Sequence, residues 1–213
     1  MLKKSMLKNG LLLALFAMLC TALVAGVNQF TYDKIKQQEA QELLRVLHQI
    51  VPDNIHDNNL IEHCILIHNQ EALGTDEPLP AYIASMAGTP VAIALEAVAP
   101  DGYNGDIKII IAIDTENQVL GVRTLSHNET PGLGDKIELR KSDWVTSFNG
   151  LSLQADNGKP WAVKKDGGDF DQFTGATITP RAYVNAVHKA ISFFKAEQQN
   201  LLSRPANCEV DYD

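Results

Sequence analysis

The sequence has little cysteine, few aromatic residues and no excess of positive charge. Only 3 of its 213 residues are cysteine, 7% are aromatic, and 18 Lys and Arg stand against 26 Asp and Glu, which gives a formal net charge of −8. Domains that bind nucleic acid usually present a basic surface with interleaved aromatic side chains. The sequence has no such stripe, so we expect no nucleic-acid partner.

The motifs of common metal sites are also missing. The sequence contains no CxxC and no HExxH pattern. His63 and His68 are an odd number of residues apart on an expected strand, so their side chains face opposite sides. The aspartates between Asp166 and Asp171 lack the spacing of a calcium loop. These patterns predict no metal site.

One long apolar run is present, close to the N-terminus. Residues 10–27 carry no charge, and three lysines precede them. A membrane-spanning helix needs about 17–25 such residues, whereas the core of a signal peptide has about 7–15. Residues 22–26 could pass for a cleavage region, so a signal peptide is the alternative. Apolar residues at helical spacing follow in 28–52 and favour an anchor whose helix continues beyond the membrane.

The three lysines also predict the orientation, because basic residues collect on the cytoplasmic side of a spanning helix. We expect a cytoplasmic N-terminus (1–9), a transmembrane helix (10–27), a juxtamembrane helix (28–52) and a main domain (53–213) in the periplasm. The chain would then be a single-pass protein of a bacterial inner membrane.

Cysteine usage agrees with an oxidising compartment. Cys20 lies in the expected span, which leaves Cys64 and Cys208 as an even pair in the outer domain. We expect a disulfide between them, with two unrelated thiols as the alternative.

The order of the expected elements in the outer domain predicts an α+β fold. Strand patterns come first and are joined by short turns, so they predict an antiparallel sheet. Helical patterns follow, and strand and helix do not alternate as in a doubly wound sheet. The expected strands are 63–69, 81–87, 90–100, 106–114, 119–127 and 160–165, and the expected helices are 136–148 and 180–198.

A glycine-rich stretch, ETPGLG (129–134), lies between an expected strand and an expected helix. Gly132 and Gly134 would let a ligand approach the backbone closely, because no Cβ intervenes. The alternative is a mere connector between the two elements.

A threonine-rich stretch, TGATIT (174–179), opens the last expected helix. Thr179 is expected to be the N-cap of this helix and Pro180 its first residue. The N-terminus of a helix also attracts anions, and Arg181 adds a cation beside it. Thr179 is therefore either an ordinary cap or the place where an anionic group such as a phosphate is held.

These stretches resemble a known family. TGATIT resembles a flavinylation signature in which the last threonine carries FMN through a phosphoester, and ETPGLGDKI (129–137) resembles a second conserved stretch of the same FMN-binding domain. With the N-terminal anchor, APDGY (99–103) and residues 161–182, nearly the whole chain resembles the RnfG family, which belongs to Rnf-type ion-translocating electron transport complexes, also called SoxR-reducing complexes. The related FMN-binding component of the sodium-pumping NADH:quinone oxidoreductase shares both motifs but is usually longer.

The resemblance implies FMN bound covalently to Thr179, attached by a flavin transferase that uses FAD as donor. The flavin would pass electrons between other membrane subunits of an NADH- or ferredoxin-linked translocase, and the isolated subunit would catalyse nothing. The further flavin contacts that it implies are Thr174, Gly175, Ala176, Thr177, Arg181, Glu129, Thr130, Gly132, Leu133 and Gly134.

Two functions of other classes are alternatives. In a membrane-tethered structural or binding module without a cofactor, Thr179 would be only a cap. A threonine-nucleophile hydrolase is disfavoured, because the motif has no His or Lys base beside it.

The expected orientation can be tested with a reporter fused after the last residue. Because the lysines keep the N-terminus in the cytoplasm, a reporter active only in the periplasm should give a signal. Activity of a reporter that works only in the cytoplasm would contradict the predicted topology.

Overall fold

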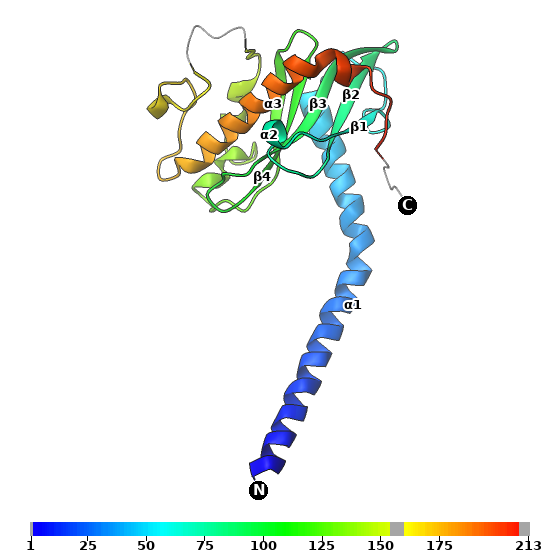
Figure 1. Cartoon of the computed structure of the whole chain (residues 1–213), viewed down its shortest axis with the longest axis vertical. Helices are drawn as coiled ribbons and strands as arrows, with labels where there is room; N and C mark the ends of the chain where they lie inside the picture. Colours follow the sequence, from blue (N-terminus) through cyan, green and yellow to red (C-terminus); the bar gives the residue numbers. More distant parts are fainter. Residues whose placement is uncertain (1, 154–159, 209–213) are drawn as a thin grey trace. The chain divides into compact units, whose positions relative to one another are not determined.

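The computed structural model describes residues 2–153 and 160–208 (Figure 1), so that 154–159 and 209–213 of the expected outer domain lie outside the described part. The chain forms two compact units, of which the first ends at Leu43 and the second begins at Leu44. This boundary falls inside the first helix, α1 (Leu2–Ile50), so the last turns of α1 belong to the second unit.

The first unit is the exposed part of α1. Its segment from Lys3 to Tyr32 is apolar and long enough to cross a membrane. An 18-residue stretch of this segment has a mean hydropathy of 2.5, and none of that stretch is buried. Length and composition alone support this reading, and a signal sequence shares both. The helix runs without a break through 22–26, the possible cleavage region, and through most of the expected juxtamembrane helix.

The second unit is built on a five-stranded antiparallel sheet with the strands in chain order. The strands are β1 (Cys64–Ile67), β2 (Leu79–Met86), β3 (Thr89–Ala99), β4 (Ile107–Asp114) and β5 (Val119–Ser126). The sequence pattern predicted all five. The expected α+β class, with an antiparallel sheet flanked by helices, is therefore confirmed.

The turns of the sheet follow from local chemistry. The two residues between β2 and β3, Ala87 and Gly88, both have positive φ, as a tight hairpin requires. Between β4 and β5, one carboxylate oxygen of Asp114 accepts hydrogen bonds from the backbone N–H groups of Glu116 and Gln118, at 2.9 and 2.8 Å. Asn117 completes this turn with a φ of 64°.

The sheet is covered on one face by the long helix α3 (Ile178–Leu202), which crosses it in Figure 1. Alternate strand residues such as Ile93, Leu95 and Ile111 are fully buried with Val187 and Phe194 of α3 in one hydrophobic core. Burial of this apolar area is the main force that holds α3 on the sheet.

The opposite face of the sheet has small side chains where the end of α1 packs. Ala94, Ala112 and Gly121 are paired in register across β3, β4 and β5. A Cβ added to Gly121 would lie 3.0 Å from the side chain of Ile50, the last residue of α1. The row of small residues therefore makes room for the helix, and Ile50 and Val51 are almost completely buried.

The predictions of two elements are wrong. The segment 136–148 is two short 3₁₀ helices, η1 (Gly134–Ile137) and η2 (Asp143–Phe148), because Ser142 is extended and its hydroxyl caps η2 through the N–H of Trp144. The apolar residues of the predicted stripe are nevertheless buried. The segment 160–165 is no strand: Val163 forms only an isolated bridge, and η3 (Lys164–Asp166) follows it.

The sequence pattern also failed to predict a short helix, α2 (Gln70–Leu73). Asn69 caps this helix by accepting a hydrogen bond from the N–H of Ala72. Gly74 ends α2 with a φ of 77°. A Cβ at Gly74 would lie 2.0 Å from the carbonyl oxygen of Val98, so only glycine fits there.

A disulfide joins Cys64 and Cys208, the pair expected from the cysteine count, with 5.4 Å between their Cα atoms. It links the segment after α3 to the edge strand β1. The backbone N–H of Asn207 donates to the carbonyl of Cys64 at 2.9 Å, and its side-chain oxygen accepts from the N–H of Leu66 at 2.7 Å. The C-terminal segment therefore covers part of an otherwise open sheet edge.

Glu96 gives the domain a specific pH dependence. Its side chain lies on β3 and is buried, and burial raises its pKa from 4.5 to about 7, although Lys108 and a hydrogen bond from Tyr82 act in the opposite direction. The folded state thus holds this proton more tightly than the unfolded state. Stability conferred by the protonated carboxyl is fully present below about pH 4.5 and is lost as pH rises through about 7.

Because glutamine cannot ionise, we expect the unfolding free energy of Glu96→Gln, relative to that of the wild type, to be higher at pH 8 than at pH 5. The change in this difference should be up to about 3 kcal/mol. Urea unfolding of the full-length protein in detergent, followed by tryptophan fluorescence, measures it. The same difference in unfolding free energy between wild type and variant at both pH values would contradict this account.

Candidate functional site

The helix α3 begins two residues earlier than the sequence predicted. Thr177 is the residue that precedes the helix, and α3 begins at Ile178, so Thr179 is its second residue and the expected N-cap role is wrong. Pro180 is tolerated at the third position because the first N–H groups of a helix have no partner within it. Thr177 has near-helical dihedral angles and makes no capping hydrogen bond with its side chain.

Thr179 is completely buried, and its hydroxyl donates a hydrogen bond to a carboxylate oxygen of Glu129 at 2.6 Å. Glu129 is itself 5% exposed and comes from the loop after β5. Its other carboxylate oxygen accepts from the backbone N–H of Asn104 at 3.2 Å. The carboxylate therefore connects three segments that are distant in the sequence.

The loop that carries Glu129 is fixed by its own hydrogen bonds. The N–H of Glu129 donates to Nδ1 of His127 at 3.0 Å, so the ring proton is on Nε2, which lies 2.8 Å from a carboxylate oxygen of Glu138. Arg140 and then His127 hold the pKa of Glu138 below its usual value. Further along, the N–H groups of residues 133 and 134 both donate to the carbonyl of Thr130 at 3.1 Å.

Glycine makes room for this buried carboxylate. A Cβ at Gly134 would lie 2.5 Å from Glu129 Oε2 and 2.9 Å from the Thr179 hydroxyl oxygen. A Cβ at Gly102 would lie 2.9 Å from Glu129 Oε1 and 2.2 Å from the carbonyl oxygen of Gly105. Any side chain at Gly102 or Gly134 would displace the carboxylate or the backbone beside it.

Aromatic packing positions the threonine-rich stretch. The ring of Trp144 makes edge-on contacts with Phe173, just before the stretch, and with Tyr183 in α3, at centroid distances of 5.1 and 5.5 Å. Its indole N–H donates to the carbonyl of Asp171 at 2.7 Å. The chain on both sides of residues 174–179 is therefore held against one buried ring.

A pocket of about 260 Å³ opens above Thr179 and Glu129. Most of the expected flavin contacts line it, but Thr174, Gly132 and Arg181 do not. The lining residues are Tyr103, Glu129, Thr130, Leu133, Gly134, Gly175, Ala176, Thr177, Ile178 and Thr179.

Arg181 does not face this pocket as the sequence suggested. Its guanidinium forms a paired hydrogen-bonded contact with Asp166, with 2.7 Å between Nη2 and Oδ1, and both side chains are exposed. The contact lowers the pKa of Asp166 and raises that of Arg181. Arg181 is the residue after Pro180, and its side chain extends to the loop at η3 instead.

Two lining residues were not expected from the sequence, Tyr103 and Ile178, whose side chains are 66% and 46% exposed. Tyr103 ends the APDGY stretch and follows Gly102, so a glycine beside an exposed aromatic residue was the available signal. The pairing of Glu129 with Thr179 had no signal in the sequence, because 50 residues separate them.

Comparisons with known proteins agree with this site. The family described as the RnfG N-terminal region matches residues 1–50, and the FMN-binding domain family matches residues 102–192, which include every residue that lines the pocket. A protein of Shewanella loihica, named as the G subunit of an ion-translocating oxidoreductase complex, is 69% identical over 212 residues, which is 100% of both chains. The chain belongs to the RnfG family.

Other members of the RnfG family are similar over almost their full length. The protein of the same name from Shewanella piezotolerans is 70% identical over 210 residues, 99% of both chains. The one from Vibrio cholerae is 55% identical over 202 residues, which is 95% of this chain and 96% of the relative. The chain therefore has the N-terminal region and the FMN-binding domain of an RnfG protein.

Proposed function

We propose that this protein is the electron-carrying subunit of a membrane-bound, ion-translocating complex of the Rnf type, and that FMN is attached to Thr179 through a phosphoester. One observation carries the proposal: within the FMN-binding domain, the Thr179 hydroxyl lines the pocket and is hydrogen-bonded to a buried carboxylate. The matches to RnfG proteins support the assignment of this chain to an ion-translocating complex.

The residues of the pocket fit a flavin phosphate. Gly175 and Ala176 leave the backbone accessible, and the start of α3 offers N–H groups without partners inside the helix. Tyr103, Leu133 and Ile178 present exposed apolar surface at the same pocket, suited to contact with an aromatic ring system. Bound FMN would supply one-electron redox chemistry, and the protein its position and surroundings.

Attachment requires a group that accepts the proton of Thr179. Esterification forms a bond between Thr179 Oγ1 and the FMN phosphorus of FAD, breaks the bond between the two phosphates, and releases AMP. The hydroxyl proton must leave, and Glu129 Oε2 already accepts its hydrogen bond at 2.6 Å. We assign to Glu129 the acceptance of this proton.

The proposal includes a place and partners for the chain. The lysines before the apolar segment favour a cytoplasmic N-terminus and a periplasmic FMN domain in a bacterial inner membrane. The unbroken course of α1 through 22–26 supports an anchor over a cleaved signal. A flavin transferase would act during maturation, and other membrane subunits would exchange electrons with the flavin.

Thr179→Ala should abolish covalent flavin, because no neighbouring hydroxyl has the same position beside Glu129. Thr177→Ala is the matched control and should remain labelled, since Thr177 precedes the helix and is not hydrogen-bonded to Glu129. Each variant is produced with the flavin transferase, denatured and examined by in-gel fluorescence. A fluorescent Thr179→Ala band would refute the assignment.

Glu129→Gln should slow attachment by about a hundredfold, because the amide keeps the shape of the side chain but cannot take the proton. Glu96→Gln is the control, since it removes another buried carboxyl that does not line the pocket. The initial rate of flavin incorporation into purified apoprotein, with transferase and FAD in excess, measures the effect. Equal rates for Glu129→Gln and wild type would exclude Glu129 as the proton acceptor.

A further inference from the structure

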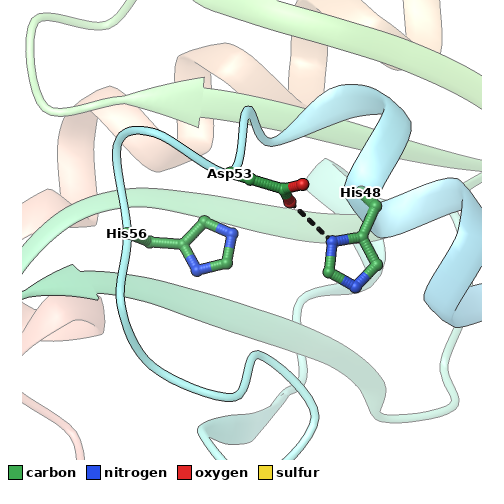
Figure 2. Close-up of side chains that lie close together, drawn as sticks. All are labelled: His48, Asp53 and His56. Carbon is green, nitrogen blue, oxygen red and sulfur yellow. Dashed lines mark hydrogen bonds and ion pairs between the residues drawn. The ribbon is translucent and has the colours of Figure 1, made fainter.

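Three side chains with metal-ligating atoms converge outside the flavin pocket. His48 lies in the last turn of α1, and Asp53 and His56 lie in the segment that leads to β1 (Figure 2). One donor atom from each residue lies within 4.8 Å of the others. All three residues belong to the second unit of the chain.

His56 has the environment of a metal ligand. Its Nδ1 lies 3.2 Å from the carbonyl oxygen of Asn58, so Nδ1 carries the proton and Nε2 has a free lone pair. Nε2 is buried, and among the residues that the structure describes it has no hydrogen-bond partner. A buried acceptor without a partner is unfavourable. Ligating histidines commonly donate their other N–H to a backbone carbonyl in this way.

His48 and Asp53 complete the group. Nδ1 of His48 lies 2.7 Å from a carboxylate oxygen of Asp53, the contact drawn as a dashed line in Figure 2. Both side chains are more than half exposed, so the imidazole can instead carry its proton on Nε2, in contact with water. This change of tautomer frees the Nδ1 lone pair and the carboxylate together, without a net change in bound protons.

We propose that His48, Asp53 and His56 bind a divalent transition-metal cation of the Zn²⁺ class. Two imidazoles and one carboxylate are a ligand set that such ions prefer, and water would complete a tetrahedron. Bonds of about 2.0–2.1 Å would require the donor atoms to move to about 3.3 Å apart. Rotation of the exposed side chains of His48 and Asp53 can supply this movement.

The surroundings suit such a site. A pocket of about 300 Å³ is lined by His48 and His56 together with Leu44, Asn58, Asn59 and Leu60. The carbonyl oxygen of Asn58 orients the His56 ring, and the Asn58 side chain is itself fixed by hydrogen bonds to the backbone of Ile83 and Ser85. The bound ion would join the last turn of α1 to the segment before β1, and it would stabilise the domain by mass action.

Metal binding is tested on full-length, untagged protein in detergent after removal of metals with a chelator. Zn²⁺ is titrated in competition with a chromophoric chelator, and Co²⁺ absorption reports on the coordination geometry. The wild type should bind one ion tightly, with a tetrahedral Co²⁺ spectrum. His56→Gln and Asp53→Asn should each weaken Zn²⁺ by at least about tenfold, because each removes a ligand.

His68→Gln is the matched control, because His68 is an exposed histidine outside the cluster, and it should bind as the wild type does. Asp53→Asn alters an exposed side chain and keeps the test valid if His56→Gln fails to fold. No stoichiometric Zn²⁺ binding by the wild type would overturn the proposal. So would equal affinities in wild type, His56→Gln and Asp53→Asn, which would place the ion elsewhere.

Discussion

The hydrogen bond between Thr179 and Glu129 lies where the start of α3, the loop after β5 and the loop before β4 meet. Both side chains are buried, so loss of either partner would leave a polar group without compensation. The surrounding residues are arranged around this requirement. Gly102 and Gly134 leave space for the carboxylate, and the N–H of Asn104 satisfies its second oxygen.

The rest of the domain determines where that hydrogen bond is formed. α3 is fixed to the sheet by an extended apolar face, and Trp144 packs both against α3 and against the segment that enters it. The opposite face of the sheet receives the end of α1 over a row of small residues. The pocket is lined mostly by loop residues, and this packing fixes the start of α3 beside them, which suits a site that must hold a cofactor in one position.

The sequence predicted the sheet well, because its strands are short apolar segments between clear turn signals. It failed at 136–148, where the apolar spacing fits a helix but the extended backbone of Ser142 divides the segment into two turns. It also predicted that α3 begins at Pro180, two residues too late, because proline is as acceptable at the third helical position as at the first. The motifs identified most of the pocket, whereas the contacts of Glu129 and Arg181 depend on tertiary structure and left no local pattern.

The central claim is that the buried hydroxyl of Thr179, and no other hydroxyl, holds the flavin. Mass spectrometry of the intact wild-type protein produced with the flavin transferase tests it most directly, when combined with fragmentation of its peptides. The account predicts a mass increase equal to FMN less one water, located on Thr179. Covalent flavin located on Thr174 or Thr177, or a fully processed protein without covalent flavin, would contradict it.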